Sequence, residues 1–159
     1  MNSIQSLRQR FSYDAWTQQR ILGALRDATD PHPSALGLFA HILSSGRIWF
    51  RRLHGEDGVG EALWPDWTLE QCEREAGDLQ AAWEAYLSRL AEGDLDSLSA
   101  YRRSKGVPIE ARIGQILEHV LVHAAYHRGQ ISSALRNGGA TPVNTDFINF
   151  LREHNTSGV

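Results

Sequence analysis

The chain lacks most of the features that would tie it to a membrane or to a secretory route. It has one cysteine, Cys72, which has no partner for an internal disulfide. It contains no run of 18 consecutive apolar residues of the kind that spans a bilayer. Its first residues, Met1 to Gln5, are too polar for the apolar segment of a signal peptide. We therefore expect a protein of the reducing cytoplasm, with no membrane partner.

The sequence also has no excess of basic residues. Lys and Arg number 16 against 19 Asp and Glu, so the formal net charge is −3. Binding to the nucleic-acid backbone needs a basic surface, and this balance argues against a nucleic-acid partner. The 159 residues, 42% of them hydrophobic, are typical of one globular domain. We expect a single domain over residues 1–159 that folds without disulfides.

Apolar residues recur at helical spacing along four long segments. The expected helices run from Ile4 to the stop signal Asp30-Pro31-His32-Pro33, from near Ser34 to Gly55, from Thr68 to about Glu92, and from Ala111 to about Asn137. Thr68 and Gln71 have the spacing of a capping box, which marks the start of the third helix. Four amphipathic helices of about 20 residues or more predict an all-α four-helix bundle.

The remaining segments are shorter. Residues 55–67 contain three glycines and a proline without any period, which predicts a loop. The stretch from Tyr101 to Ile109, around Ser104-Lys105-Gly106, fits either a short hairpin or an irregular crossover. A short fifth helix, Asp146–Glu153, is expected to cover one end of the bundle.

Histidines are the most distinctive feature of the sequence. Three of the seven, His119, His123 and His127, fall at steps of four residues in the fourth expected helix. Each such step advances about 40° around a helix, so the three lie on one narrow stripe. Two histidines one turn apart can bind one ion together. A third ligand must come from another element, and His41 is the other histidine deep inside an expected helix.

A structural role is the alternative for these histidines. A lone inward histidine such as His41 is usually hydrogen-bonded to a carbonyl group in the core. A stripe of three uncoordinated rings, however, would place several polar groups in an apolar interface, each needing a partner. Two familiar metal patterns do not fit: Ala124 stands where a metalloprotease helix has its Glu, and Leu121 stands where a di-iron helix has its second ligand, three residues after Glu118.

The order of several motifs resembles one known family. The motifs are Tyr13-x-x-Trp16, His41-Ile42 with Arg47-x-Trp49, His123-x-x-x-His127-Arg128-Gly129-Gln130, and Thr145-Asp146-Phe147 with Leu151-Arg152. Together they resemble the DinB family of bacterial four-helix proteins, the DinB/YfiT-like metalloenzymes. The resemblance implies an up-up-down-down bundle, a divalent metal on His41, His123 and His127, and often a homodimer. Family members often carry Asn where this chain has Gln18.

Three neutral histidines would leave a zinc ion with two uncompensated positive charges, which favours binding of a thiol as its thiolate. Enzymes of the wider superfamily use such sites with low-molecular-weight thiols such as bacillithiol or mycothiol. The resemblance therefore implies a metal-dependent thiol S-transferase or a related detoxification enzyme. The alternatives are a non-enzymatic metal-binding stress-response protein and a plain helical interaction module. Zinc and nickel are the expected metals, and iron also accepts imidazole.

Residues around the histidines have their own expected roles. His119 is expected to face inward without binding the metal, and Gln130 to orient a ligand histidine. Arg128 is expected to pair with an acid on a neighbouring helix, and Gly129 to permit close helix packing. Cys72 is expected to be a buried, inert thiol.

The second expected helix is apolar on nearly every side. This surplus predicts that Phe50, Leu53 and the segment Trp64-Pro65-Asp66-Trp67 are covered by a second copy in a homodimer. The alternative is that the loop folds back over its own chain.

Overall fold

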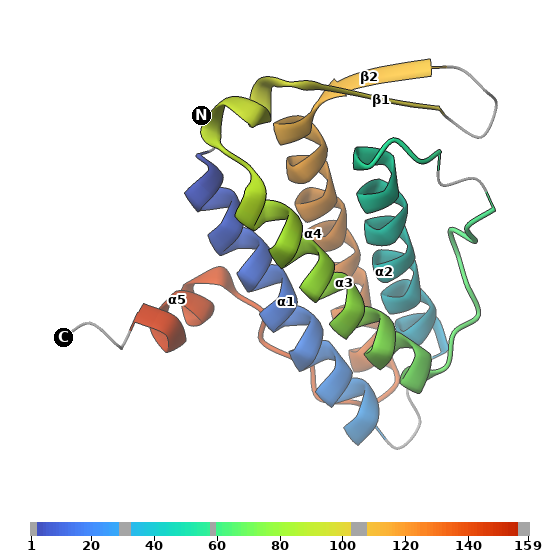
Figure 1. Ribbon diagram of the computed structural model, residues 1–159. Coiled ribbons are helices and arrows are strands. Elements are labelled where there is room, and N and C mark those ends of the chain that lie inside the picture. Colours follow the sequence, from blue (N-terminus) through green and yellow to red (C-terminus); the bar gives the residue numbers. More distant parts are fainter. Residues whose placement is uncertain (1–2, 29–32, 58–59, 103–107, 156–159) are drawn as a thin grey trace.

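The computed structural model describes residues 3–28, 33–57, 60–102 and 108–155. Its helices are α1 (Ile4–Asp27), α2 (Pro33–Leu53), α3 (Leu69–Arg89), α4 (Ile113–Asn137) and α5 (Phe147–Asn155), with a 3-10 helix η1 (Glu92–Asp96). Two strands, β1 (Leu98–Arg102) and β2 (Pro108–Arg112), lie between η1 and α4. The expected four-helix bundle with a short fifth helix is confirmed (Figure 1).

The order of the helix directions differs from the expected up-up-down-down arrangement. In Figure 1, α1 and α4 run downward while α2 and α3 run upward. The contacts agree, because Arg10 and Asp14 of α1 bind Glu118 and Arg128 of α4 in the same order, as parallel helices do. The bundle is therefore up-down-down-up.

The lengths of the connections between the helices explain this order. Only residues 28–32 join α1 to α2, and five residues span at most about 17 Å. A parallel α1 and α2 would need a connection that returns along the whole of α1, which is about 36 Å long at 1.5 Å per residue. The longer segment 54–68 instead makes the return between α2 and α3.

The helix boundaries follow their local signals. Thr68 caps α3, with its hydroxyl accepting from the Gln71 amide and the Gln71 side chain accepting from the Thr68 amide. The helix ends at Arg89, earlier than expected, because the chain enters η1. Helix α1 ends at Asp27, and the stop signal from Asp30 to His32 lies outside the described residues.

Of the two alternatives for residues 101–109, the hairpin is the one observed. Strands β1 and β2 pair antiparallel, with Leu98 opposite Arg112 and Tyr101 opposite Ile109. The turn at Ser104-Lys105-Gly106 lies outside the described residues. The hairpin extends over the top of the bundle, above α2 and α4 (Figure 1).

Helix α5 does not cover an end of the bundle, as the sequence suggested. It packs against the side of α1, where the Tyr13 ring lies 5.0 Å from Phe147 and the Trp16 ring 5.8 Å from Phe150 (Figure 1). The Trp16 indole also donates to Glu153 at 2.9 Å. Apolar rings on both helices make the flank of α1 the surface that α5 buries.

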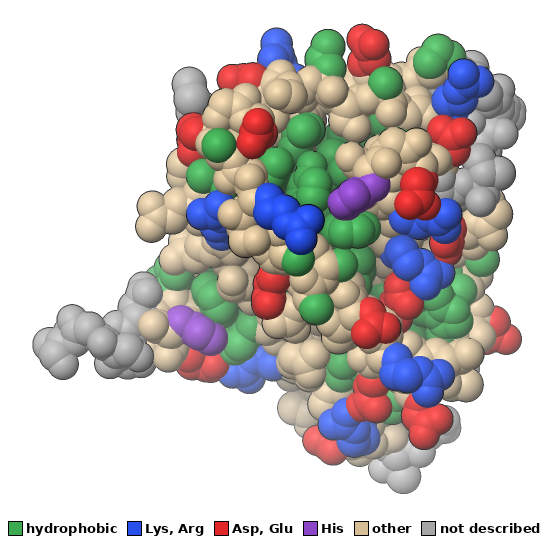
Figure 2. Space-filling view, in the orientation of Figure 1, with side chains coloured by type: hydrophobic (Ala, Val, Ile, Leu, Met, Phe, Trp, Pro, Cys, Tyr) green, Lys and Arg blue, Asp and Glu red, His purple; other side chains and the backbone are tan. Residues whose placement is uncertain are grey.

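The core lies between the four long helices. Its fully buried side chains include Phe39, Leu7, Leu43, Leu117 and Leu135. Cys72 is fully buried, as expected, and burial raises the pKa of its thiol to about 11, which disfavours the reactive thiolate. On the face that Figure 2 shows, charges of both signs are interspersed, and apolar side chains are visible in a hollow below the hairpin. No helix in the described parts of the chain meets the length and hydropathy that crossing a bilayer requires.

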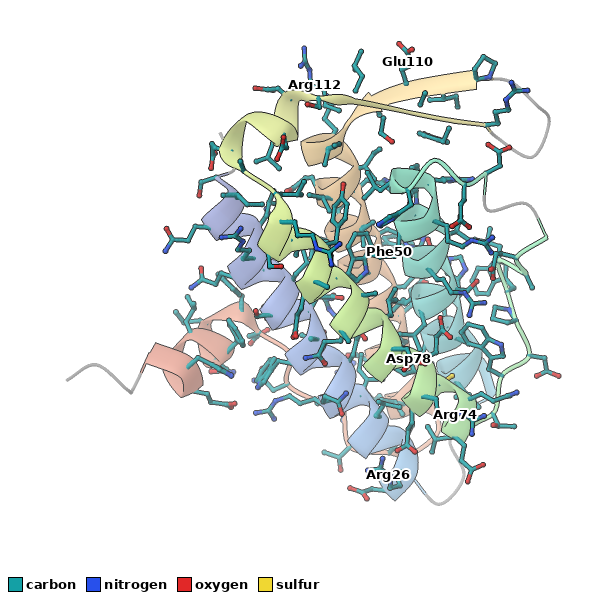
Figure 3. The ribbon with its side chains drawn as sticks, in the orientation of Figure 1. Arg26, Phe50, Arg74, Asp78, Glu110 and Arg112 are labelled. Carbon is teal, nitrogen blue, oxygen red and sulfur yellow. The ribbon has the colours of Figure 1, made fainter. Side chains whose placement is uncertain are left out.

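Part of the surface expected to form a dimer interface packs against the core of its own chain. Phe50 points between α2 and α3, with its ring 5.1 Å from Trp83, and Leu53 and Trp67 also pack against the core (Figure 3). Trp64 keeps 58% of its surface exposed. The loop thus folds back over its own chain, and the homodimer stays a prediction.

One ion pair is buried inside the bundle. Arg128 of α4 is hydrogen-bonded to the Asp14 carboxylate of α1, and the two residues are 8% and 6% exposed. Gln18 donates to the other oxygen of Asp14 at 2.8 Å. The expectation that Arg128 pairs with an acid on a neighbouring helix is confirmed.

Removing one partner of this pair leaves a buried charge without compensation. We expect Arg128→Ala to lower the free energy of unfolding by about 3–5 kcal/mol, measured by urea denaturation. Arg26→Ala is the matched control, because Arg26 pairs with Glu73 at the exposed end of α1 (Figure 3) and its loss should cost less than about 1 kcal/mol. Equal effects of the two substitutions would contradict a stabilising role for the buried pair.

Candidate metal centre

The three histidines of the expected metal site come from two antiparallel helices. His41 lies in the middle of α2, and His123 and His127 lie one turn apart in α4. The spacing of four residues puts the two α4 rings on the same face. Because α2 packs along α4, that face meets His41, and the structure brings the three rings together.

The ring nitrogens converge on one point. His123 Nε2 lies 3.2 Å from His41 Nε2 and 3.2 Å from His127 Nε2. The ligand atoms of the three residues all lie within 4.8 Å of one another. Two zinc–imidazole bonds that meet at a tetrahedral angle place their nitrogens about 3.3–3.4 Å apart. The three histidines are therefore positioned to hold a metal ion.

Hydrogen bonds made by Nδ1 of His41 and of His127 determine that Nε2 of each ring faces the point of convergence. His41 Nδ1 lies 2.8 Å from the carbonyl oxygen of Leu63, and His127 Nδ1 lies 2.7 Å from Gln130 Oε1. Both partners are acceptors, so each Nδ1 carries the proton and each Nε2 of the neutral rings presents a lone pair. The role expected for Gln130, which was to orient a ligand histidine, agrees with this contact.

Hydrogen bonds among the three rings cannot satisfy all three Nε2 atoms. His123 Nε2 faces two lone pairs, those of His41 and His127, and it carries one proton at most. At least one of the two 3.2 Å contacts therefore joins two acceptors. A cation at the point of convergence accepts all three lone pairs, so the residues present fit a divalent metal.

The surroundings favour the neutral form of His123 and of His41. Burial, followed by the neighbouring His127 and His41, lowers the pKa of His123 to about 4. Burial also lowers the pKa of His41 below its usual value. Neutral imidazole is the form that binds metals, so the site is ready for an ion at neutral pH.

His119, the fourth histidine of the region, lies outside the trio. It is exposed, with its ring 4.9 Å from Trp49 and 5.9 Å from His123. Burial, together with the charge of Arg52, lowers the pKa of His119. Its nitrogens are not among the three converging ligand atoms, as expected from the sequence, but the expected inward position is wrong, because the side chain is exposed.

The loop after α2 supplies contacts that the sequence did not reveal. Besides the Leu63 carbonyl, the Trp64 indole stacks on the His41 ring at 3.7 Å, nearly parallel to it. The loop is held to α2 by Ser44, which donates to the Ala62 carbonyl at 2.6 Å, and by the ion pair of Arg47 with Glu61. The turn formers of residues 55–67 predicted only that this segment is a loop.

The polar residues of α1 lie behind the site. Gln18, Asp14 and His123 line the same small interior cavity, together with Ser45 of α2. The Gln18 amide is used to bind Asp14.

Comparison with known proteins shows the family of the chain and its fold. The model of the DinB family matches residues 2–157. The chain belongs to the DinB family. It is 24% identical to Protein DinB of Bacillus subtilis (strain 168) over 160 residues, which cover 89% of this chain and 91% of that protein.

The fold is also that of a solved member of the same group. The crystal structure of a DinB-like protein from Bacillus cereus ATCC 10987 superposes with a TM-score of 0.64 at 18% sequence identity. The match covers 90% of this chain and 97% of that one. The DinB bundle, with its two pairs of parallel helices, is thus the scaffold that brings His41 to the α4 pair.

We expect the purified protein to bind about one divalent ion per chain. His41→Ala, His123→Ala or His127→Ala should each lower the metal content severalfold, because two imidazoles hold an ion much less tightly than three. His54→Ala is the control, since His54 is exposed and contacts only its own helix and Tyr86. Metal analysis of protein made without a His tag measures this. Full occupancy in all three ligand variants would show that the ion binds elsewhere.

Gln130→Leu should weaken zinc binding about 10–100-fold, because it removes the acceptor that fixes His127 Nδ1–H. Gln130→Glu keeps an acceptor at this position and should bind zinc nearly as tightly as the parent protein. Gln130 is exposed, so neither change should affect folding. Competition with a chromophoric chelator gives both affinities. Unchanged binding by Gln130→Leu would mean that the contact is incidental to the site.

Proposed function

We propose that this DinB-family protein is a metal-dependent enzyme that transfers thiols to electrophilic small molecules. One observation carries the proposal: the Nε2 atoms of three histidines converge, and with neutral rings at least one pair of acceptors faces each other. Such a set of groups is stable with a cation between them. Three protein ligands also leave at least one coordination position for a substrate.

His41, His123 and His127 would hold the ion, which is zinc or nickel in our proposal. When bound, the ion supplies Lewis acidity that favours the thiolate form of a low-molecular-weight thiol at neutral pH. The Leu63 carbonyl and Gln130 keep the ligand rings oriented. The three ligands are uncharged, so the positive charge that stabilises a thiolate is not neutralised by the protein.

The proposed reaction is a nucleophilic substitution or addition. The thiol gives up its proton to solvent, the thiolate sulfur forms a bond to an electrophilic carbon, and in a substitution the leaving group departs with the bonding electron pair. Exposed apolar groups near the site, Trp64 and Leu63, provide a surface for the carbon skeleton of the electrophile.

The alternative is a non-enzymatic metal-binding stress-response protein. One observation favours it: within the described residues, no carboxylate is hydrogen-bonded to any of the three rings. A centre without a nearby acid or base suits storage or sensing of an ion as well as thiol chemistry, in which solvent can take the proton.

Consumption of thiols separates the two functions. We expect zinc- or nickel-loaded protein to accelerate the loss of a low-molecular-weight thiol in the presence of a panel of electrophiles, measured by colorimetric thiol titration. Removal of the metal or His123→Ala should abolish the acceleration, and His54→Ala should preserve it. Fully loaded protein that consumes no thiol with any member of the panel would rule out the transferase and favour the metal-binding alternative.

A further inference from the structure

A groove runs along the surface beside the metal centre, between the start of α2 and the end of α4. It has a volume of about 420 Å³ and is lined by Ser34 and Leu38 of α2 and by Tyr126, Gln130, Ser133 and Asn137 of α4. This volume is within the range of small-molecule sites, about 300–1,000 Å³.

Two residues make the groove continuous with the metal centre. Gln130 lines the groove and binds His127 Nδ1 at 2.7 Å, and the Tyr126 ring lies 5.0 Å from the His127 ring. Leu38 precedes His41 by one turn of α2. A molecule in the groove would therefore lie next to two of the three ligand histidines.

The charge of the groove restricts what it can bind. None of the described residues that line it carries a formal charge. The groove at the other end of the histidine row, beside His119, is different, since Glu92, Asp96, Arg112 and Glu118 line it. A charged molecule would lose hydration in the uncharged groove without gaining an ionic partner from the residues that line it. A cation would also be repelled by a metal ion at the three histidines, so the groove favours an uncharged molecule over a cationic one.

Two exposed aromatic rings lie against the ligand histidine His127, and one of them, Tyr126, also lines the groove. Tyr126 is 65% exposed and Trp64 is 58% exposed. Both rings contact His127 nearly edge-on, with centroid distances of 5.0 Å and 6.1 Å. Two solvent-exposed aromatic side chains against one ligand histidine form a surface on which another aromatic ring can pack.

We propose that this groove binds the electrophilic substrate and that this substrate is an uncharged compound with an aromatic ring, which packs against Trp64 and Tyr126. The inference rests on the proposed thiol transfer, because a thiol needs only its sulfur at the ion, whereas the second substrate needs an adjoining surface. The hydroxyl and amide groups of Ser133 and Asn137 provide hydrogen bonds for polar substituents farther along the groove.

Gly129 is a position at which a substitution can fill the groove without changing a ligand histidine. The sequence suggested that this glycine permits close helix packing, but a Cβ added to it would meet no atom within 4 Å. It forms part of the groove wall instead. A larger side chain at this position should fill the groove while preserving the helix. Gly77 of α3 is a matched control, because it is also helical and also has open space around its Cα.

The test uses zinc-loaded, ¹⁵N-labelled protein and acetanilide, a neutral aromatic amide, as the probe. We expect acetanilide to shift the NMR signals of the Trp64 indole N–H, assigned with Trp64→Phe, and of the Gly129 and Gln130 amides. Gly129→Leu should weaken binding about tenfold or more, and Gly77→Leu should leave it unchanged. Phenyltrimethylammonium and benzylammonium, which carry a positive charge beside the same ring, should bind about tenfold more weakly than acetanilide.

Metal content, measured on the same samples, separates the two proposals. Zinc-loaded protein whose Trp64 and Gly129 signals do not respond to acetanilide would overturn the groove and leave the thiol chemistry standing. Equal affinity for the charged rings, or full affinity in Gly129→Leu, would also overturn it. Binding of acetanilide at these signals by a protein that takes up no zinc would support the groove and overturn the proposed function.

Discussion

The candidate site depends on two hydrogen bonds made by nitrogens that do not face the metal position. His41 Nδ1 donates to the Leu63 carbonyl and His127 Nδ1 donates to Gln130, so both Nε2 lone pairs are directed at His123. His123 Nε2 can donate to only one of them, so at least one pair of lone pairs repels unless a cation lies between the two nitrogens. The fold keeps the rings in place by packing α2 against α4 and by stacking Trp64 on His41. The ability of the three histidines to hold an ion thus depends on which ring nitrogens carry the protons.

Much of the fold could be predicted from periodicity and capping. The four long helices and the capping box at Thr68 are local features, and local signals are sufficient to place them. The up-up-down-down order implied by the resemblance was wrong. The sequence could have excluded it, because the connection at residues 28–32 is too short for a parallel α1 and α2. The position of α5 was also wrong, because its partner surface on α1, around Tyr13 and Trp16, is set by tertiary packing.

The candidate site was predictable to a different degree for each residue. His123 and His127 followed from their spacing, and His41 from its place inside a helix together with the resemblance. The Leu63 carbonyl had no signal, because a backbone acceptor in a loop has no residue type that marks it. Asp14 was missed as well, since one acid in an amphipathic helix looks like a solvated residue until Arg128 is found opposite to it.

Long-range ¹H–¹⁵N NMR of the histidine rings tests the central claim most directly, because it identifies the protonated nitrogen in each ring. The account predicts that His41 and His127 are Nδ1–H tautomers both without metal and with one equivalent of zinc. It also predicts that zinc shifts the Nε2 signals of His41, His123 and His127 and leaves those of His119 nearly unchanged. A proton on Nε2 of His41 or His127 in the zinc-loaded protein, or a zinc-dependent shift of His119 in place of His123, would contradict it.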